Sequence, residues 1–351
     1  MSLPLLSVLM ANYNHAHYLR EAIPAILNQS YNPIELVIVD DGSTDDSIEV
    51  IEGYAKRDSR LHLVRHENNL GWTAAFKSLL EKFKGEYFIS TSADDIILPG
   101  LFEKSMKLLS QYPQAGLCCA ISERIDDDGK NLRPVPELPR ISKSPCYLSP
   151  EETLDLWVNG EWDWCMPSTA VWKTKAVMEA GGFPDEAGEF ADAFSVFLIS
   201  LNYGACFIPE SLGVFRVRSD SLSSIYRRDP KMFKVRFEEA EKLMTSRVYA
   251  DKFPLVFIRE FRKRSLYEMG AMSLQGLDSV LGDSMSFLGH LSSNSNIWDR
   301  RVVSLCSIYF KTGIFISKLY LFLRLRRISL YMLRRIFYRI YNRKKYRPVQ
   351  P

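Results

Sequence analysis

Short apolar runs alternate with amphipathic stretches through the first hundred residues. The runs are typical of buried strands in a parallel sheet, and the stretches between them carry apolar residues at helical spacing. Strand followed by helix in this rhythm indicates a mostly parallel sheet flanked by helices, which is an α/β fold class. The predicted strands are 5–10, 34–39, 61–64 and 87–89, and the predicted helices are 18–29, 47–57 and 72–83.

The pattern becomes less regular after residue 100 and changes again near Asp229-Pro230. Long, charged amphipathic segments after this point predict a C-terminal helical extension that packs on the first domain, binds a ligand or forms a homo-oligomer. We therefore expect a domain over 1–225 with halves 1–100 and 101–225, an extension over 226–300 and a tail over 301–351. The later predicted helices are 101–112, 151–159, 193–201, 233–249 and 253–272, and the later strands are 115–120 and 167–172, with closing strands in 207–216.

The tail is basic and aromatic-rich. From Lys311 onward it holds 12 Lys and Arg and no acid, which leaves 33 bases against 42 acids in the rest of a chain of net charge +3. On a helix, its apolar residues fall on one side and its arginines on the other, a pattern that favours an anionic membrane surface. Lys311 and Lys318 interrupt the one stretch that is apolar enough to suggest a span. We expect a cytoplasmic protein, peripheral at the inner face of the membrane; a helix that packs on the body is the alternative.

Several classes of protein are disfavoured by what the chain lacks. The six cysteines form no CxxC pair and have no histidine partners at zinc spacing, so reduced thiols are expected. No GxGxxG or GxxxxGK[ST] occurs, which disfavours a Rossmann dinucleotide site and a P-loop kinase. The first residues lack a basic region before their short apolar run and read as a strand rather than a signal peptide. No motif supports nucleic-acid binding.

Polar loops follow three of the predicted strands, at 12–14, 40–45 and 94–95. Ligands of parallel sheets bind beyond the carboxyl ends of the strands, so these loops are expected to converge on one ligand. Asp94 and Asp95 supply hard oxygen ligands that suit Mg²⁺ or Mn²⁺ together with phosphate oxygens. Successive strand residues point to opposite faces, so one carboxylate can face the ligand while the other braces the loop. The alternative is an acidic turn that caps the helix at 101–112.

Four motifs stand in order along the first hundred residues: SVLMANYNH (7–15), LNQSY (27–31), ELVIVDDGSTDDS (35–47) and SADD (92–95). In this order and spacing they resemble family 2 glycosyltransferases over roughly residues 5–220. The resemblance implies a GT-A fold and inverting chemistry. It also implies that Asp40 hydrogen-bonds the nucleotide base, that Tyr13 stacks on that base, and that Asp94 and Asp95 bind ribose, diphosphate and a divalent metal, with Asp95 the favoured ligand. Asp41 is a weaker candidate for the nucleotide site, and Tyr13 taken alone reads as a packed aromatic.

The chain departs from that family in two places. Ser92 stands where many members have the first acid of Asp-x-Asp-Asp, which removes one carboxylate from the metal site. The family's Asn-x-Gly…Ala-Arg-Asn loop survives only as Asn-Leu-Gly at 69–71 and Ala-Phe-Lys at 75–77. Lys77 or Arg65 could supply the charge of the missing arginine.

The segment 181–194 resembles the acceptor side of the same family, in which an acid after Gly-Gly-Phe begins a helix. The resemblance makes Asp192 the catalytic base, with Glu189 as the alternative; the other interpretation of Asp192 is a helix cap. A base is needed because a hydroxyl is a poor nucleophile near neutral pH. The aromatic cluster at 161–165 could stack on a sugar ring. Arg216 and Arg218 either reach the diphosphate or are exposed loop arginines.

The sequence thus predicts a nucleotide-binding half and an acceptor half of an inverting, Mn²⁺- or Mg²⁺-dependent glycosyltransferase. The expected donor is a nucleoside diphosphate sugar with UDP as the nucleotide. The expected acceptor is a hydroxyl of a glycan or lipid-linked molecule in cell-surface polysaccharide synthesis. The alternative is a non-catalytic glycan-binding or scaffold protein on a degenerate transferase fold. A nucleotidyltransferase is weaker, because no basic loop is present to hold a triphosphate.

Overall fold

The computed structural model describes residues 3–132, 141–162, 164–221, 224–225 and 229–276. The predicted tail over 301–351, its membrane contact and the last part of the helical extension lie outside these residues. Among the described helices, none combines the length and the apolar character needed to cross a membrane.

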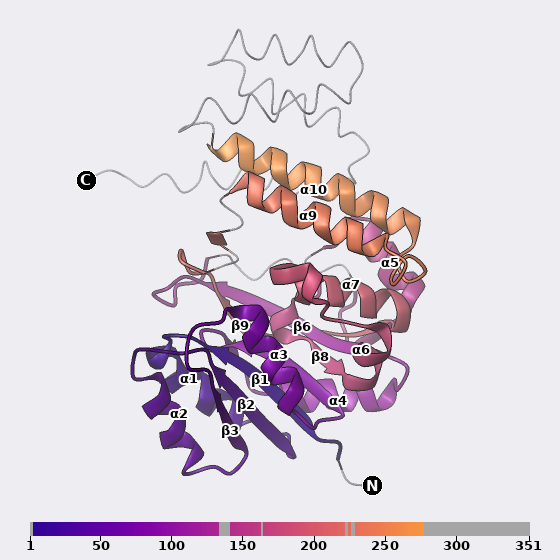
Figure 1. Cartoon of the computed structure of the whole chain (residues 1–351). Coiled ribbons are helices and arrows are strands. Elements are labelled where there is room, and N and C mark those ends of the chain that lie inside the picture. Colours follow the sequence, from indigo (N-terminus) through magenta and orange to yellow (C-terminus); the bar gives the residue numbers. More distant parts are fainter. Residues whose placement is uncertain (1–2, 133–140, 163, 222–223, 226–228, 277–351) are drawn as a thin grey trace, which may run out of the picture.

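One mixed sheet runs through the molecule in the order β3-β2-β1-β4-β8-β6-β9-β5, with β7 paired to β9 (Figure 1). Strands β1 to β4 are parallel to one another, whereas β8 runs antiparallel to both β4 and β6. The predicted fold class, a mostly parallel sheet flanked by helices, is confirmed. The strands are β1 Leu6–Asn12, β2 Ile34–Asp40, β3 Leu61–Arg65, β4 Tyr87–Ser92, β5 Ile96–Ile97, β6 Leu117–Ile125, β7 Cys146–Leu148, β8 Val171–Lys173 and β9 Ala205–Arg216.

Helices cover both faces of this sheet. Alternation along the strands explains why, since successive residues of β1 and β2 point to opposite faces. Leu6, Val8 and Met10 join a buried cluster with α1, α2 and α4, whereas Leu9 joins a second cluster with Val37 and helices α3, α5, α6 and α7. The helices are α1 Ala16–Leu27, α2 Ser47–Ala55, α3 Trp72–Lys82, α4 Leu101–Gln111, α5 Pro150–Val158, α6 Thr174–Ala180, α7 Ala191–Tyr203, α9 Pro230–Met244 and α10 Leu255–Gly276, with 3₁₀ turns η1 Pro167–Thr169 and η2 Asp185–Phe190.

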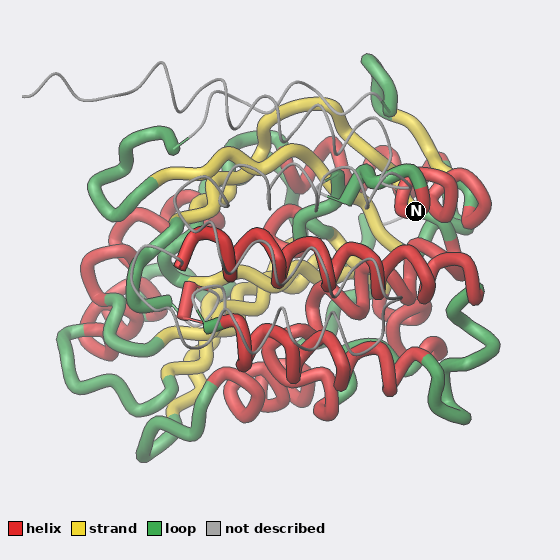
Figure 2. The backbone as a smooth tube through the Cα atoms, turned by 90° about the horizontal axis from the view of Figure 1, so that it is seen from above, coloured by secondary structure: helices red, strands yellow, loops and turns green. Residues whose placement is uncertain are grey.

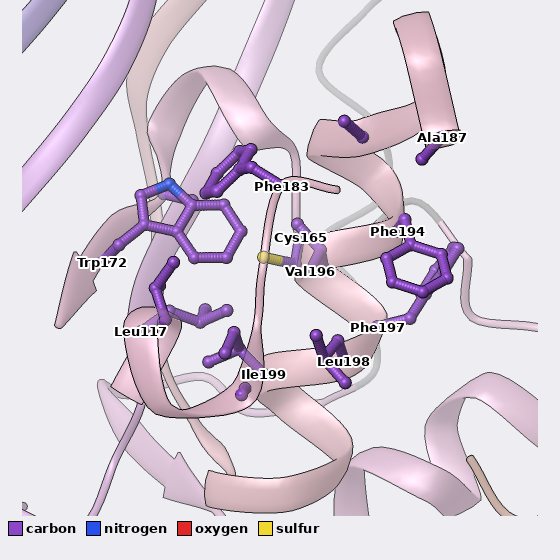
Figure 3. Close-up of a cluster of buried hydrophobic side chains, with 14 of the residues drawn as sticks. Leu117, Cys165, Trp172, Phe183, Ala187, Phe194, Val196, Phe197, Leu198 and Ile199 are labelled. Carbon is purple, nitrogen blue, oxygen red and sulfur yellow. The ribbon is translucent and has the colours of Figure 1, made fainter. Parts of the chain in front are cut away.

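The second cluster is dense in aromatic side chains around α7. Figure 3 shows Trp172 and Phe183 beside Val196 and Ile199 of that helix. The rings of Trp172 and Phe183 meet edge to face, with centroids 5.2 Å apart, a favourable arrangement for aromatic pairs. Phe183 begins the segment that leads to Asp192, so the core anchors this segment directly.

Helices α9 and α10 lie side by side against the rest of the fold (Figures 1 and 2). Phenylalanines make the contact: Phe237 of α9 packs on Phe190, with centroids 5.4 Å apart, and Phe257 of α10 packs on Phe197 of α7 at 5.3 Å. The described part of the extension therefore packs on the first domain, which is one of the three roles that the sequence left open.

Two local expectations were wrong. The predicted strand 167–172 is a 3₁₀ turn, η1, followed by the short strand β8, because Pro167 begins a helical turn more readily than a sheet interior. The tryptophans of the cluster at 161–165, expected to be available to a sugar, are buried. Trp164 is 2% exposed, and the Trp162 ring lies 5.6 Å from that of Phe197. These tryptophans are core residues.

Candidate functional site

The ends of β2 and β4 lie at the same edge of the sheet, on either side of β1. Asn12 is opposite Asp40 in the β1–β2 register, and Ala11 is opposite Ser92 in the β1–β4 register. Neighbouring strands are about 4.8 Å apart, so the β2 and β4 ends are separated by about 10 Å. The structure therefore brings Asp40 and the Asp94–Asp95 turn to one edge, as the strand pattern predicted.

The Asp40 carboxylate is buried and held from two sides. It accepts hydrogen bonds from Asn12 Nδ2 at 2.7 Å and from the backbone N–H and hydroxyl of Ser43 at 2.9 and 2.6 Å. This network fixes the loop after β2 against the end of β1. Tyr13, the next residue after β1, is 40% exposed, so its ring is not a core aromatic and can meet a ligand at the surface of this edge.

Asp94 and Asp95 lie in a tight turn between β4 and β5. The Asp95 N–H donates to the Ser92 carbonyl at 3.3 Å, which closes the turn. β5 then pairs antiparallel with β9, with Ile96 opposite Val214. This pairing brings the end of β9 beside the turn, and the Arg216 N–H donates to Asp95 Oδ1 at 3.1 Å.

The Asp95 carboxyl is 6% exposed. Burial first, and the charge of Asp94 second, raise its pKa well above the usual 3.8, while the Arg216 N–H and side chain act in the opposite direction. A buried carboxyl beside a second acid is costly to ionise without a cation. This arrangement is the chemical setting in which a divalent ion is favoured.

Two arginines from the end of β9 surround the acidic turn. Arg216 is 6% exposed, and its guanidinium donates to the Asp94 carbonyl at 3.2 Å and to the carbonyls of Asp126 and Asp127 at 3.3 and 3.2 Å. Arg216 is therefore a structural brace of this edge rather than an exposed loop residue.

Arg218 contacts the carboxylate of the turn instead of its backbone. Its Nη1 lies 3.5 Å from Asp94 Oδ2 and also contacts His15 Nε2, while its Nη2 pairs with Asp220 at 2.7 Å. Burial lowers the pKa of His15, which suits a neutral ring whose Nε2 accepts from Arg218. Arg218 thus brings a cation to the edge where a diphosphate is expected.

Asp41 faces a different part of the molecule from Asp40. Its Oδ1 accepts from His66 Nδ1 at 2.6 Å and from the Leu70 N–H at 3.0 Å, and its Oδ2 accepts from the Gly71 N–H at 2.8 Å. His66 in turn contacts Ser78 Oγ of α3 at 3.0 Å through Nε2. We call these groups the Asp41 clamp; they fix the start of α3.

Asp192 lies in the first turn of α7, where a negative charge is favourable. Its Oδ1 accepts from the Ala193 N–H at 2.5 Å, and the cap position belongs to Phe190. Glu189, the alternative base, forms an ion pair with Arg236 of α9 at 2.9 Å. Glu189 is therefore engaged by the helical extension.

Sequence reasoning missed a cleft of about 190 Å³ beside α3, lined in part by Trp72, Phe76, Lys77, Asp185 and Ala191. The Trp72 and Phe76 rings stack with centroids 5.0 Å apart and planes 5° from parallel. Lys77, considered as a replacement for the family arginine, lies on this cleft. Arg65, the other candidate, pairs with Glu52 at 3.9 Å. The signal that could have found the cleft is the aromatic pair one helical turn apart at the start of α3.

The residues of the edge fit a divalent cation. The described part of the chain holds no group of three or more His, Cys, Asp or Glu that could enclose one. Mg²⁺ and similar ions, however, commonly bind to one or two carboxylates and complete their shell with water and substrate phosphates. Asp95, together with Asp94, supplies that donor set.

Comparison with known sequences gives one family. The family model "Glycosyl transferase family 2" matches residues 7–156. An uncharacterized glycosyltransferase of Haemophilus influenzae is 41% identical over 111 residues, covering 32% of this chain and 44% of that protein. TuaG of Bacillus subtilis, named as a teichuronic acid biosynthesis glycosyltransferase, is 33% identical over 108 residues, covering 31% of this chain and 43% of that protein. The chain spans less than half the length of these relatives.

Solved structures share the fold at low identity. TarS 1–349 of S. aureus in complex with UDP-GlcNAc has a TM-score of 0.55 and 15% identity, covering 85% of this chain and 90% of that chain. The mannosyltransferase PcManGT of Pyrobaculum calidifontis in complex with GDP-Man and Mn²⁺ has a TM-score of 0.54 and 18% identity, covering 91% of this chain and 88% of that chain. Both similarities extend well beyond the segment that the family model matches.

Proposed function

Residues 7–156 belong to glycosyl transferase family 2, and from this premise we propose that the protein is an inverting, metal-dependent glycosyltransferase. It transfers a sugar from a nucleoside diphosphate sugar, with UDP as the nucleotide, to a hydroxyl acceptor. The observation that carries the proposal is the meeting of Asp40 and the Asp94–Asp95 turn at one edge of the sheet. Asp40, proposed for the nucleotide base, then lies about 10 Å from the turn with Asp94 and Asp95, proposed for the diphosphate and its metal, which is close to the length of one nucleotide.

In this proposal the nucleotide lies across the ends of β1, β2 and β4. Tyr13 offers an exposed ring for stacking on the base. Asp40, held rigid by Asn12 and Ser43, accepts from a base N–H. Asp94 binds on the ribose and diphosphate side, where Arg218 supplies a positive charge for the phosphates.

Asp95, assisted by Asp94, would hold Mn²⁺ or Mg²⁺. When bound, the ion would supply positive charge to the leaving nucleoside diphosphate. The neighbouring protein groups have a separate task. The Arg216 N–H holds Asp95 Oδ1, and the Arg216 guanidinium ties the Asp94 backbone to the turn at Asp126 and Asp127, so both carboxylates are oriented before a ligand arrives. Ser92 leaves the set one carboxylate short, and water can take that position.

Asp192 is the proposed catalytic base. It accepts the proton of the acceptor hydroxyl as the acceptor oxygen bonds to the anomeric carbon. The bond from that carbon to the diphosphate oxygen breaks, the nucleoside diphosphate leaves with the electron pair, and attack from the opposite side inverts the carbon. Its position in the first turn of α7 supports this choice.

The acceptor in this proposal is a glycan or lipid-linked molecule of cell-surface polysaccharide synthesis, handled at the inner face of the membrane. The name of TuaG, a relative over 108 residues, supports the pathway class. The basic tail, which lies outside the described residues, supports attachment to an anionic lipid surface.

The test measures UDP or GDP release from a panel of sugar nucleotides with Mn²⁺, with Mg²⁺ or with chelator. We expect metal-dependent release from at least one donor and a loss of 10²-fold or more in Asp192→Asn. Asp95→Ala should lose both turnover and Mn²⁺-dependent UDP binding by calorimetry. Asp155→Asn, an exposed acid of α5, is the matched control and should keep full activity.

Each outcome bears on a separate part of the proposal. Undiminished turnover in Asp95→Ala or Asp192→Asn removes that residue from its role. A wild-type protein that binds neither UDP nor Mn²⁺, and releases no nucleotide from any donor, would favour the non-catalytic glycan-binding or scaffold alternative instead.

A further inference from the structure

We infer that the cleft beside α3 binds a pyranose ring of the acceptor, so that the acceptor is a saccharide stacked on Trp72. The inference rests on the proposed function and names the substrate class of its second substrate. The cleft runs between the first turns of α3 and the segment 183–191. No residue of the ends of β1, β2 or β4 lines it, so it is separate from the nucleotide edge.

The walls of the cleft have the chemistry of a sugar site. Trp72, Phe76 and Phe183 give it an aromatic lining, with the Phe76 and Phe183 rings 4.8 Å apart. The face of an aromatic ring carries partial negative charge, and the C–H groups on one face of a pyranose carry partial positive charge that complements it. A volume of about 190 Å³ is below the about 300–1,000 Å³ of sites for drug-sized ligands, which suits a single ring.

The rim of the cleft is polar. Lys77 Nζ and Asp185 Oδ2 lie 3.8 Å apart across it, and both side chains are more than 60% exposed. A pair this open and this long contributes little to stability. Its donors and acceptors are therefore available to exchange partners for sugar hydroxyls, which fix the orientation of a ring that stacking alone leaves free to rotate.

The walls of the cleft are adjacent along the chain to both parts of the proposed active site. Trp72 directly follows Gly71, whose N–H is held by the Asp41 clamp beside Asp40. At the other end, Ala191 lines the cleft and directly precedes Asp192, the proposed base. A ring on Trp72 therefore occupies a cleft whose far wall leads into the residue proposed to take its hydroxyl proton.

The wall at 183–191 is built to stay in place. Ser195 Oγ accepts from the Phe183 N–H and donates to the Ala191 carbonyl, each at 2.7 Å, so one buried hydroxyl ties both ends of this segment to α7. Gly188 lines the cleft with a φ of 52°, a conformation that glycine adopts without strain. The site is thus preformed, which lowers the cost of binding.

The experiment uses saturation-transfer NMR on the full chain with methyl glycosides of glucose, galactose, mannose and N-acetylglucosamine, and with ribitol as a non-cyclic control. We expect signals from the C–H face of at least one pyranoside and none from ribitol. Trp72→Ala should weaken that binding about tenfold, and Trp72→Phe should retain most of it. Leu70→Ala, which removes a 62%-exposed side chain two residues earlier, should leave it unchanged.

A second pair of variants guards against misfolding of Trp72→Ala. Lys77→Ala alters an exposed rim residue and should weaken pyranoside binding, whereas Lys82→Ala, at the exposed end of the same helix, should not. Absence of pyranoside signals from the wild type, or signals of wild-type strength from both Trp72→Ala and Lys77→Ala, would overturn the inference.

Competition separates the acceptor ring from the donor sugar. Signals that persist with saturating sugar nucleotide support the acceptor, whereas signals that survive UDP but vanish with sugar nucleotides assign the cleft to the donor sugar and overturn the inference. Binding is measured without turnover. Absence of nucleotide release from every donor therefore refutes only the proposed function. Turnover without pyranoside binding refutes only the inference that the cleft holds the acceptor ring.

Discussion

The Asp41 clamp should contribute strongly to stability, and Asp41→Asn measures that contribution. The carboxylate accepts three hydrogen bonds, from His66, Leu70 and Gly71, and is almost fully buried. An amide keeps one oxygen for His66 and Leu70 but turns its NH₂ group towards the Gly71 N–H, where two donors face each other.

The size of the effect follows from these three bonds. A hydrogen bond to a charged group contributes about 1.5–3 kcal/mol, and the two that remain fall to the about 0.5–1.5 kcal/mol of neutral bonds. We therefore expect Asp41→Asn to lower the free energy of unfolding by about 3–5 kcal/mol, because one hydrogen bond is lost and two are weakened. Total stability is only about 5–15 kcal/mol, so the variant should be marginal.

Urea unfolding followed by circular dichroism gives the free energy, and amide hydrogen exchange reports the loop itself. The Leu70 and Gly71 amides should exchange faster in Asp41→Asn than in the wild type. Asp46→Asn, at an exposed position five residues later, is the matched control and should change stability by about 0.5 kcal/mol or less. A loss below about 1 kcal/mol in Asp41→Asn, or unchanged protection of these two amides, would refute the reasoning.

Three further changes test other parts of the structure. Burial and Asp94 raise the pKa of Asp95, so the folded protein without metal or nucleotide keeps a proton that the unfolded chain releases, and the free energy of unfolding should fall as the pH rises above about 4. Asp95→Asn should remove this pH dependence and stabilise the metal-free protein at pH 7 by about 0.5–2 kcal/mol in urea unfolding. An unchanged pH profile of stability would contradict this. Gly204→Ala should lower the free energy of unfolding by about 2–4 kcal/mol in the same assay, because the φ of Gly204 is 70° and a Cβ would collide with the Leu148 carbonyl. Gly53→Ala in α2, where an added Cβ meets nothing, should instead raise it by about 0.5–1 kcal/mol. Equal effects of the two substitutions would contradict this reasoning. Ser195→Ala should cost about 1–3 kcal/mol by thermal or urea unfolding, because the Phe183 N–H loses its acceptor, and a neutral result would show that this tie is dispensable.

Local pattern was sufficient for the sheet edge that holds Asp40 and Asp94. The apolar runs of β1, β2 and β4 are covered on both faces, so composition alone identifies them, and parallel pairing then puts Asp40 and Asp94 at the same edge. The start of α3 at Trp72 was also predicted, since Gly71 precedes a clear helical spacing.

Contacts between distant residues were beyond that reasoning. Arg216 reaches Asp95, 121 positions away in sequence, only because β5 pairs with β9. The burial of Trp162 and Trp164 depends on α10 and β9 packing over them, as their contacts with Phe257 and Phe207 show. The cleft at Trp72 needs the segment 183–191 as its second wall. The hydrophobic periodicity of a segment does not show which of its aromatic residues other elements will cover.

The phenylalanine contacts of α9 and α10 bear on how the chain can be divided for study. A fragment ending at residue 225, the boundary suggested by composition, would leave Phe190, Phe194 and Phe197 facing water. Tyr249 and Phe253 both pack on Phe194, with ring centroids 5.2 and 5.1 Å away. Loss of these partners would expose a hydrophobic surface next to the proposed base, and such a surface promotes self-association. The smallest fragment worth purifying therefore runs through Gly276, and aggregation of a shorter one would say nothing about whether the enzyme works.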